Sequence, residues 1–115
     1  MDKLLVSIIM NAHNAEKYLE LSVKSALNQT YENFEIIFFN NNSKDNTEKI
    51  IKKFKDRRIK YFEVNKYLKL GEARNEAIKK SQGDFIAFLD CDDIWFPKKL
   101  EYQIPKFKNQ KVGIV

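Results

Sequence analysis

The sequence predicts an α/β fold in which a mostly parallel sheet is flanked by helices. Apolar strand-like runs alternate with segments whose apolar residues recur at helical spacing. Such alternation implies right-handed crossovers and a sheet covered on both faces. Three of the strand-like runs end in polar clusters, and ligands of such sheets bind beyond the carboxyl ends of the strands. The 115 residues, 43% hydrophobic and 32% charged, suit one small domain spanning residues 1–115.

The first half of the chain contains two predicted strands and two predicted helices. Leu4 to Met10 is apolar and rich in β-branched residues, which indicates a buried strand. A segment from Ala15 to Leu27 has the apolar spacing of a helix, and Glu35 to Phe39 is a second buried strand. We expect Asp45 to cap the next helix, with Glu48 three residues on completing a capping box.

The middle of the chain continues the alternation. Ile59 to Val64 is a weaker strand that suits a position near a sheet edge. Leu70 to Ile78 carries a third helical pattern, and Gly83 is expected to close that helix. Phe85 to Leu89 is wholly apolar, which is typical of a central parallel strand.

The last quarter of the chain predicts one more helix and the start of a strand. Pro97 suits the first position of the helix, and Pro105 should kink or end it. We expect the aromatic pair Trp95-Phe96 to be buried between the sheet and this helix. Residues Val112 to Val115 resemble the beginning of another strand.

The bulk composition favours a cytoplasmic protein. The net charge of +5 comes from 21 basic and 16 acidic residues, and the bases are spread along the chain, so we expect a solvated lysine-rich surface and no nucleic-acid partner. No apolar run approaches the roughly 18 residues of a membrane span, and the N-terminus lacks the pattern of a signal peptide. A single cysteine excludes an internal disulfide and fits a reducing cytosol.

Three carboxylates within four residues follow the last complete strand, at Asp90, Asp92 and Asp93. They repel one another unless a cation or hydrogen-bond donors compensate. Alternation in an extended chain would put Asp90 and Asp92 on one side and Cys91 on the other. Two oxygen ligands on one side suit Mg²⁺ or Mn²⁺, with diphosphate oxygens and water completing the coordination. The competing interpretation is a helix N-terminal cap, a role that suits Asp93 ahead of Pro97.

Two asparagine-rich clusters and one arginine complete the set of candidate residues. The clusters are Asn11 to Asn14 after the first strand and Asn40 to Ser43 after the second. Asparagine and serine dominate turns for local reasons, but a ligand-facing asparagine also suits the edge of a base. Arg74 falls within the inward stripe of its helix, where it either pairs with the acidic cluster or reaches a ligand phosphate. Both roles stay open.

The motifs together resemble the N-terminal half of glycosyltransferase family two, whose nucleotide-binding half has the Rossmann-like GT-A fold. The resemblance covers essentially the whole chain, and the order and spacing of its blocks are more specific than any one block. The matching blocks are VSIIMNAHNAEKYLELSVKSALNQTYENFEII, NNNSKDNT, ARNEAIKKSQGDFIAFLDCDD and PKKLE.

The resemblance implies a set of donor-binding residues. The segment Asn11, Ala12, His13 and Asn14 matches the family's contact with the nucleotide base. Asn41 matches an acidic position that reads the uracil edge, and Arg74 matches an arginine near the nucleotide. The segment Asp90-Cys91-Asp92 matches the family's D-x-D motif. There Asp92 is implied to be the direct metal ligand, and Asp90 to lie nearer the ribose or the water shell of the metal.

The chain departs from the family pattern at several of these positions. The family's first loop usually reads Pro-x-Tyr-Asn, where this chain has Asn11 to Asn14. The paired acids that precede Gly-Ser in the family are replaced by asparagines in Asn40 to Asn42, and Lys69 replaces a common glycine. These departures leave the identity of the donor base open.

The resemblance further implies a bacterial glycosyltransferase of polysaccharide or glycan biosynthesis. Its expected donor is a nucleotide-diphosphate sugar, foremost a UDP-sugar, its cofactor Mn²⁺ or Mg²⁺, and its acceptor a glycan or a lipid-linked molecule. The general base is expected beyond Val115, so we expect a chain truncated before the acceptor-binding half and inactive alone. The alternative is a non-catalytic nucleotide-sugar-binding or assembly module. The sequence leaves a homodimer and peripheral association with the inner face of the membrane open.

Overall fold

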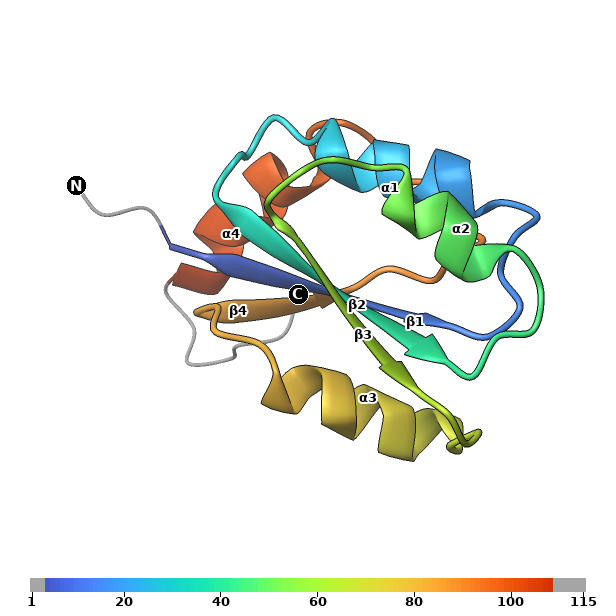
Figure 1. Cartoon of the computed structure of the whole chain (residues 1–115). Coiled ribbons are helices and arrows are strands. Elements are labelled where there is room, and N and C mark those ends of the chain that lie inside the picture. The colour runs from blue at the N-terminus through green and yellow to red at the C-terminus, as the bar shows by residue number, and fades with distance from the viewer. Residues whose placement is uncertain (1–3, 109–115) are drawn as a thin grey trace.

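The computed structural model describes residues 4–108, in which four strands and four helices alternate. The predicted strand at Val112 to Val115 lies outside the described residues. The elements run in the order shown in Figure 1: β1 (Val6–Ala12), α1 (Leu19–Leu27), β2 (Phe34–Asn41), α2 (Thr47–Lys52), β3 (Ile59–Val64), α3 (Leu70–Lys79), β4 (Phe85–Phe88) and α4 (Lys99–Lys108).

The four strands form one parallel sheet in the order β3-β2-β1-β4. In the register of the central strand β1, Ile8 lies opposite Ile36 of β2 and Ala87 of β4. The carboxyl ends of these three strands therefore meet at one edge of the sheet. The predicted parallel α/β architecture is confirmed.

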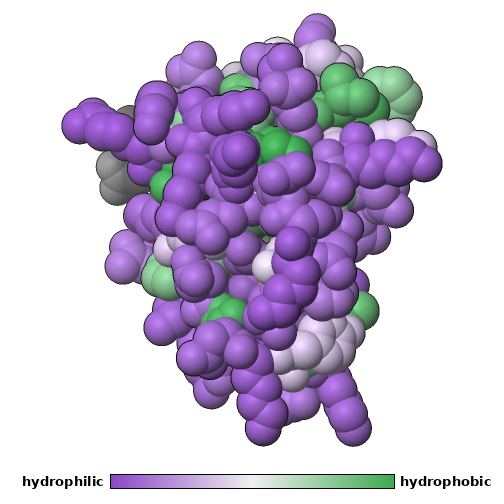
Figure 2. Space-filling view, turned by 45° about the vertical axis from the view of Figure 1, so that its right-hand side comes forward, coloured by the Kyte–Doolittle hydropathy of each residue, from purple (hydrophilic) through white to green (hydrophobic). Residues whose placement is uncertain are grey.

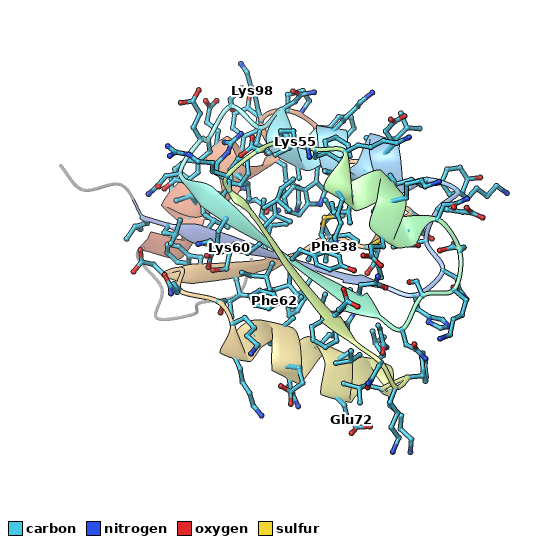
Figure 3. The ribbon with its side chains drawn as sticks, in the orientation of Figure 1. Phe38, Lys55, Lys60, Phe62, Glu72 and Lys98 are labelled. Atoms are coloured by element: carbon cyan, nitrogen blue, oxygen red, sulfur yellow. The ribbon has the colours of Figure 1, made fainter. Side chains whose placement is uncertain are left out.

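Two apolar cores lie on the two faces of the sheet. The larger core packs β1, β2 and β4 against α1, α2 and α4, and it contains Phe38, which is fully buried. The smaller core packs the other face against α3 alone, with Ile37, Phe39 and Ala73 at its centre and Phe62 beside them. Figure 3 labels Phe38 on the side of the sheet that faces α2 and Phe62 on the side that faces α3.

The strand β4 has one neighbour in the described part of the chain, although a central position was predicted for it. It pairs with β1 and forms an edge of the described sheet. Phe85 and Ala87 are buried on the side of α1 and α4, whereas Ile86 and Phe88 are only partly buried on the side of α3. The strand β4 is therefore more apolar than its packing within the described residues requires.

The helix boundaries differ from the predictions for local reasons. Asp45 does accept hydrogen bonds from the backbone and hydroxyl of Thr47 at the start of α2, but Glu48 pairs with Lys52 at 2.6 Å and forms no capping box. The last helix begins at Lys99 instead of Pro97, and Pro105 lies within it without ending it.

Gly83 is required by close packing and not by a helix end. The helix α3 ends at Lys79 with Lys80 as its C-cap, and no glycine in the described chain has a positive φ. A Cβ atom at Gly83 would lie 2.4 Å from the hydroxyl of Ser7. The backbone N–H of Gly83 instead donates to that hydroxyl at 2.8 Å.

A buried carboxylate organises the amino ends of the strands. The side chain of Glu35 is 4% exposed and forms an ion pair with Lys60 at 3.1 Å. It accepts hydrogen bonds from Ser7 Oγ at 2.6 Å and from the backbone of Gln82 at 2.7 Å. Burial raises the pKa of Glu35, but these hydrogen bonds and the charge of Lys60 outweigh it, so the pKa lies below its usual value.

None of the helices within residues 4–108 is long and apolar enough to cross a membrane.

We predict that Glu35→Gln lowers the free energy of unfolding at pH 7 by about 1–3 kcal/mol, because a charge-assisted buried network is broken. The lowered pKa means that the ionised carboxylate stabilises the fold above about pH 4.3, the usual value for a free glutamate. This stability is lost as the pH falls through the folded-state pKa, so the gap between the variant and the wild type should narrow in acid. Urea denaturation at several pH values measures this difference in the free energy of unfolding.

The matched control for this experiment is Glu48→Gln, which breaks an ion pair whose side chains are 49% and 54% exposed. Exposed helical pairs of this kind contribute at most about 0.5 kcal/mol. If the loss of unfolding free energy in Glu35→Gln stays constant between pH 7 and strong acid, the assigned role of the carboxylate is contradicted.

Candidate functional site

A cavity of about 320 Å³ opens at the carboxyl edge of the sheet. Its volume lies at the lower end of the range of small-molecule sites. Three segments contribute to it: the end of β1, the loop that enters α1, and the turn after β4. The lining residues are Asn11, His13, Asn14, Ala15, Lys17, Tyr18, Asp90, Cys91 and Asp92.

The acidic segment forms a turn beside this cavity. One carboxylate oxygen from each of Asp90, Asp92 and Asp93 lies within 4.8 Å of the others, and all three residues are exposed. The backbone N–H of Asp93 donates to the carbonyl of Asp90 at 3.0 Å, so the segment is a turn and not the extended chain that was predicted. Asp93 joins the carboxylate cluster and caps no helix, because α4 begins at Lys99.

The acidic segment is anchored from two sides. The hydroxyl of Ser22, fully buried in α1, donates to the carbonyl of Asp90 at 3.0 Å. The thiol of Cys91 donates to the carbonyl of Asn11 at 3.3 Å. Burial, with the nearby charges of Asp90 and Asp92, raises the pKa of Cys91 to about 12, so the thiol stays protonated and anchors the turn instead of serving as a thiolate ligand. Sequence analysis missed Ser22, although a small polar residue on the inward face of a helix is an available signal.

Asn11 carries an unpaired polar atom at the same place. Its Oδ1 is buried and accepts no hydrogen bond from the described residues, and Asn11 lines the cavity. A buried acceptor without a donor is costly. Three clustered carboxylates and this amide oxygen are the hard oxygen donors that Mg²⁺ and Mn²⁺ prefer, so the residues present fit a divalent cation.

The loop after β1 is fixed by the loop after β2. Asn14 adopts a φ of 52°, a left-handed conformation that asparagine tolerates better than most residues. Its backbone N–H donates to Ser43 Oγ at 2.9 Å, and its side-chain oxygen accepts from the backbone of Lys44 at 2.7 Å. The next backbone N–H, of Ala15, donates to the buried hydroxyl of Thr47 at 2.8 Å. These bonds hold the first loop at the cavity.

His13 connects the first loop to the end of β2. Its Nδ1 lies 2.8 Å from the carbonyl oxygen of Asn41, which only accepts, so Nδ1 carries the proton. The other nitrogen, Nε2, accepts from the side-chain amide of Asn14 at 3.4 Å. The imidazole also meets the ring of Tyr67 edge to face, with centroids 4.7 Å apart. This aromatic surface is suited to pack against a base.

Asn41 uses its side chain to hold the chain before α3. Its amide nitrogen donates to the carbonyl of Leu68 at 2.8 Å, and its amide oxygen accepts from the N–H of Leu68 at 2.9 Å. The residue is 4% exposed and does not line the cavity. Ala12 is buried as the last residue of β1 and does not line the cavity either.

Arg74 lies apart from the acidic cluster. Its guanidinium lies over the ring of Phe88, 5.3 Å from the centroid. In the described part of the chain it forms no ion pair, so the structural bridge that was one of its two predicted roles is not formed.

Three residues of the cavity, Ala15, Lys17 and Tyr18, were not predicted as site residues. Tyr18 lies within the segment from Ala15 to Leu27 that was predicted to be helical, but α1 begins one residue later, at Leu19, and Tyr18 is 46% exposed. The ammonium of Lys17 lies 5.2 Å from the centroid of the Tyr18 ring. Lys17 is the cationic side chain that the described cavity offers.

Comparison with known sequences identifies relatives of the whole chain. The family described as Glycosyl transferase family 2 matches residues 7–115. The UDP-Glc:alpha-D-GlcNAc-diphosphoundecaprenol beta-1,3-glucosyltransferase WfgD of Escherichia coli is 50% identical over 100% of this chain and 46% of its own length. A second E. coli enzyme of the same description, WfaP, is 44% identical over 94% of this chain and 43% of its own length. The chain thus spans less than half the length of these relatives.

Solved structures share the fold. A fragment of S. aureus TarS in complex with UDP superposes with a TM-score of 0.84 at 26% identity, covering 90% of this chain and 32% of that one. The mannosyltransferase PcManGT of Pyrobaculum calidifontis, in complex with GDP-Man and Mn²⁺, gives a TM-score of 0.86 at 18% identity over 91% of this chain and 32% of that one. The predicted GT-A fold is confirmed by these similarities.

We predict that Asn41→Asp destabilises the protein by about 1–3 kcal/mol at pH 7, because a carboxylate cannot donate to the carbonyl of Leu68 and repels it. That repulsion would raise the pKa of the new carboxyl. The loss should therefore be full above the raised pKa and should shrink as the pH falls and the group is protonated. Thermal unfolding between pH 4 and pH 8 measures this loss of stability.

Asn75→Asp is the control for this substitution, since Asn75 is an exposed residue of α3 and the charge change is the same. Its stability should stay within about 0.5 kcal/mol of the wild type. Equal melting temperatures for Asn41→Asp and the wild type at pH 7 would exclude a structural role for the Asn41 amide.

Proposed function

The chain belongs to glycosyl transferase family 2, and from that premise we propose that it binds the nucleotide-sugar donor of an enzyme that transfers a sugar to an acceptor hydroxyl. One observation carries the proposal. The carboxylates of Asp90, Asp92 and Asp93 gather beside a cavity that the loop from Asn11 to Asn14 also lines. A metal-dependent diphosphate site next to a base-binding loop is what donor binding requires.

The proposed donor is a UDP-sugar. The names of WfgD and WfaP specify UDP-Glc, and TarS has been solved with UDP and with UDP-GlcNAc. In this chain the first loop, with the imidazole of His13 beside Tyr67, would contact the base. Asn41 would contribute through its backbone position at the end of β2, since its amide is engaged by Leu68. Arg74 would reach the nucleotide by leaving the ring of Phe88.

The proposed cofactor is Mn²⁺ or Mg²⁺, held by Asp92 with Asp90. When bound, such a cation neutralises negative charge on the departing diphosphate. Asp93 would add negative charge to the same cluster, and Asn11 Oδ1 would accept a hydrogen bond from the donor or from water in the cavity. Ser22 and Cys91 would act through the backbone, by holding the turn in place. Lys17, which lines the same cavity, would offset the charge of the phosphates.

The proposed acceptor of the enzyme is a lipid-linked glycan precursor. The name of WfgD describes an acceptor with a diphosphoundecaprenol carrier, and this chain is 50% identical to it. Such an acceptor is presented at a membrane surface, so we place the enzyme in the cytoplasm at the inner face of the membrane, in glycan biosynthesis.

We predict that Asp92→Asn weakens Mn²⁺-dependent binding of UDP at least about tenfold, because the cluster loses a carboxylate charge. Isothermal titration calorimetry with and without Mn²⁺ measures the affinity. Glu20→Gln, which neutralises an exposed acid of α1, is the control and should leave the affinity unchanged. Unchanged UDP affinity in Asp92→Asn, or wild-type binding that is equally tight without a cation, would overturn the metal assignment.

We also predict that these 115 residues bind the donor without transferring its sugar. The carboxylates that line the described cavity are Asp90 and Asp92, both assigned to the cation, which leaves no base beside the attacking hydroxyl. Release of UDP from UDP-glucose, with and without a polyprenyl-diphosphate sugar acceptor, measures turnover. A rate above the enzyme-free background would show that the chain carries its own base.

A further inference from the structure

The exposed apolar side chains of the protein are unevenly distributed. Seven large hydrophobic residues in the described chain are prominently exposed, and five of them lie at the N-cap of α1, within α1, or in the segment from the acidic turn through α4. Phe96 is the most exposed of all, at 85%, although burial was predicted for it from the sequence. The five residues are Tyr18, Leu21, Ile94, Phe96 and Tyr102.

Hydrogen bonds and a shared groove connect the segments that carry these five residues. Tyr18, Leu21 and Ser25 follow one another at helical spacing along α1. Ser25 Oγ accepts from the backbone N–H of Trp95 at 3.1 Å, which places this stripe against the segment that contains Ile94 and Phe96. Gln29, which follows the C-cap of α1, fixes the same segment from its other end, since its side chain donates to the carbonyl of Phe96 at 2.7 Å. We call this surface the α1–α4 face.

The views of the molecule agree with this placement. Figure 1 shows α1 and the connection to α4 together at the top of the molecule. Figure 2 is turned about the vertical axis and shows a mainly hydrophilic surface, with its largest group of hydrophobic side chains at the upper right. That group lies at the height of α1 and of the segment leading to α4.

Three lysines lie beside Phe96 and Tyr102, two of the apolar residues of this face. Lys98, Lys99 and Lys106 line a shallow groove of about 460 Å³ together with Phe96, Tyr102 and Gln103. None of the three lysines forms an ion pair within residues 4–108. Lys99 donates to the side-chain oxygen of Gln103 at 3.1 Å, and Lys98 points away from the ribbon at its upper edge in Figure 3. Within residues 4–108, therefore, no carboxylate lies at ion-pair distance from these three lysines.

Exposed aromatic rings beside unpaired lysines have the chemistry of a surface that lies on a membrane. Aromatic side chains insert at the level of the lipid headgroups, and lysine stems reach the anionic phosphates around them. Juxtaposed lysines are attracted by the negative potential of an anionic leaflet. A second copy of the chain is a poor occupant, because a two-fold pairing would bring the same lysines face to face.

We propose that the α1–α4 face docks on the anionic surface of a lipid bilayer. The proposal rests on the proposed function in one respect, since a membrane-bound acceptor gives docking a purpose. Tyr18 belongs both to this face and to the cavity wall, and Ile94 directly follows the acidic cluster. Docking therefore sets the rim of the cavity at the height of the lipid headgroups, where the sugar of a lipid-linked acceptor lies.

Vesicle co-sedimentation of the 115-residue chain tests this proposal. The vesicles contain phosphatidylcholine alone or phosphatidylcholine with one quarter phosphatidylglycerol, each at low and high salt. The chain should sediment with the anionic vesicles at low salt, at least about tenfold more than with the neutral ones, and salt should weaken the binding. The double variants Phe96→Ser with Tyr102→Ser, and Lys98→Glu with Lys106→Glu, should each lower the binding at least about tenfold.

The matched controls lie on α3, on the opposite face of the sheet. Leu70→Ser removes an apolar side chain that is 54% exposed, and Lys79→Glu reverses a lysine whose side chain is 70% exposed. Equal loss of binding in these controls, equal binding to neutral and anionic vesicles, or no binding at all would overturn the proposal. So would sedimentation equilibrium that shows a dimer disrupted by Phe96→Ser.

Calorimetry of the same variants separates this proposal from the proposed function. Phe96→Ser with Tyr102→Ser should bind UDP and Mn²⁺ like the wild type, because neither residue lines the cavity. If the wild-type chain binds anionic vesicles but does not bind UDP, only donor binding is contradicted. If the wild-type chain binds UDP but does not bind anionic vesicles, only the docking surface is contradicted.

Discussion

The hydrogen bonds between the loops that follow β1 and β2 are the constraint on which the site depends. Parallel pairing brings the ends of the two strands side by side, with Ala12 opposite Asn40, but it does not determine the path of the chain beyond them. Asn14 determines it, because its left-handed backbone turns the chain and its amide and N–H bind Lys44 and Ser43. The cavity wall is therefore built by backbone and amide groups that are engaged within the protein.

The acidic turn is held by the same kind of contact. Ser22 and Cys91 bind backbone carbonyls, so the carboxylates of Asp90, Asp92 and Asp93 are left free at the surface. Three exposed carboxylates within 4.8 Å of one another are unfavourable alone and favourable around a cation. The protein thus uses buried hydrogen bonds to position the acidic turn, and the three carboxylate charges remain available to a ligand.

Much of the fold followed from the sequence, because strand and helix periodicities here are strong and local. The third strand was predicted at Ile59 to Val64 and begins and ends there. The convergence of the first loop and the acidic segment on one cavity followed from the rule for parallel sheets. The turn conformation of the acidic segment did not, since the bond from Asp93 to Asp90 depends on how the chain leaves β4.

Other features depend on tertiary contacts that no sequence pattern carries. The pairing of the Asn41 amide with Leu68 joins residues 27 positions apart, and an asparagine in a polar cluster gives no sign of it. The helix α4 runs through Pro105, against the usual expectation for proline. Phe96 is held through its backbone carbonyl, which accepts from the Gln29 side chain, while the residue is 85% exposed.

Divalent-cation and nucleotide binding at the carboxyl edge of the sheet is tested most directly by paramagnetic broadening. In ¹H–¹⁵N spectra of the chain with UDP, substoichiometric Mn²⁺ should first broaden the amide signals of Asn11 to Asn14 and of Asp90 to Asp93. The amides around Glu35 and Gln82, at the opposite edge of the sheet, should keep their intensity. Broadening that is uniform, or that begins at the Glu35 edge, would contradict a metal site at the acidic turn.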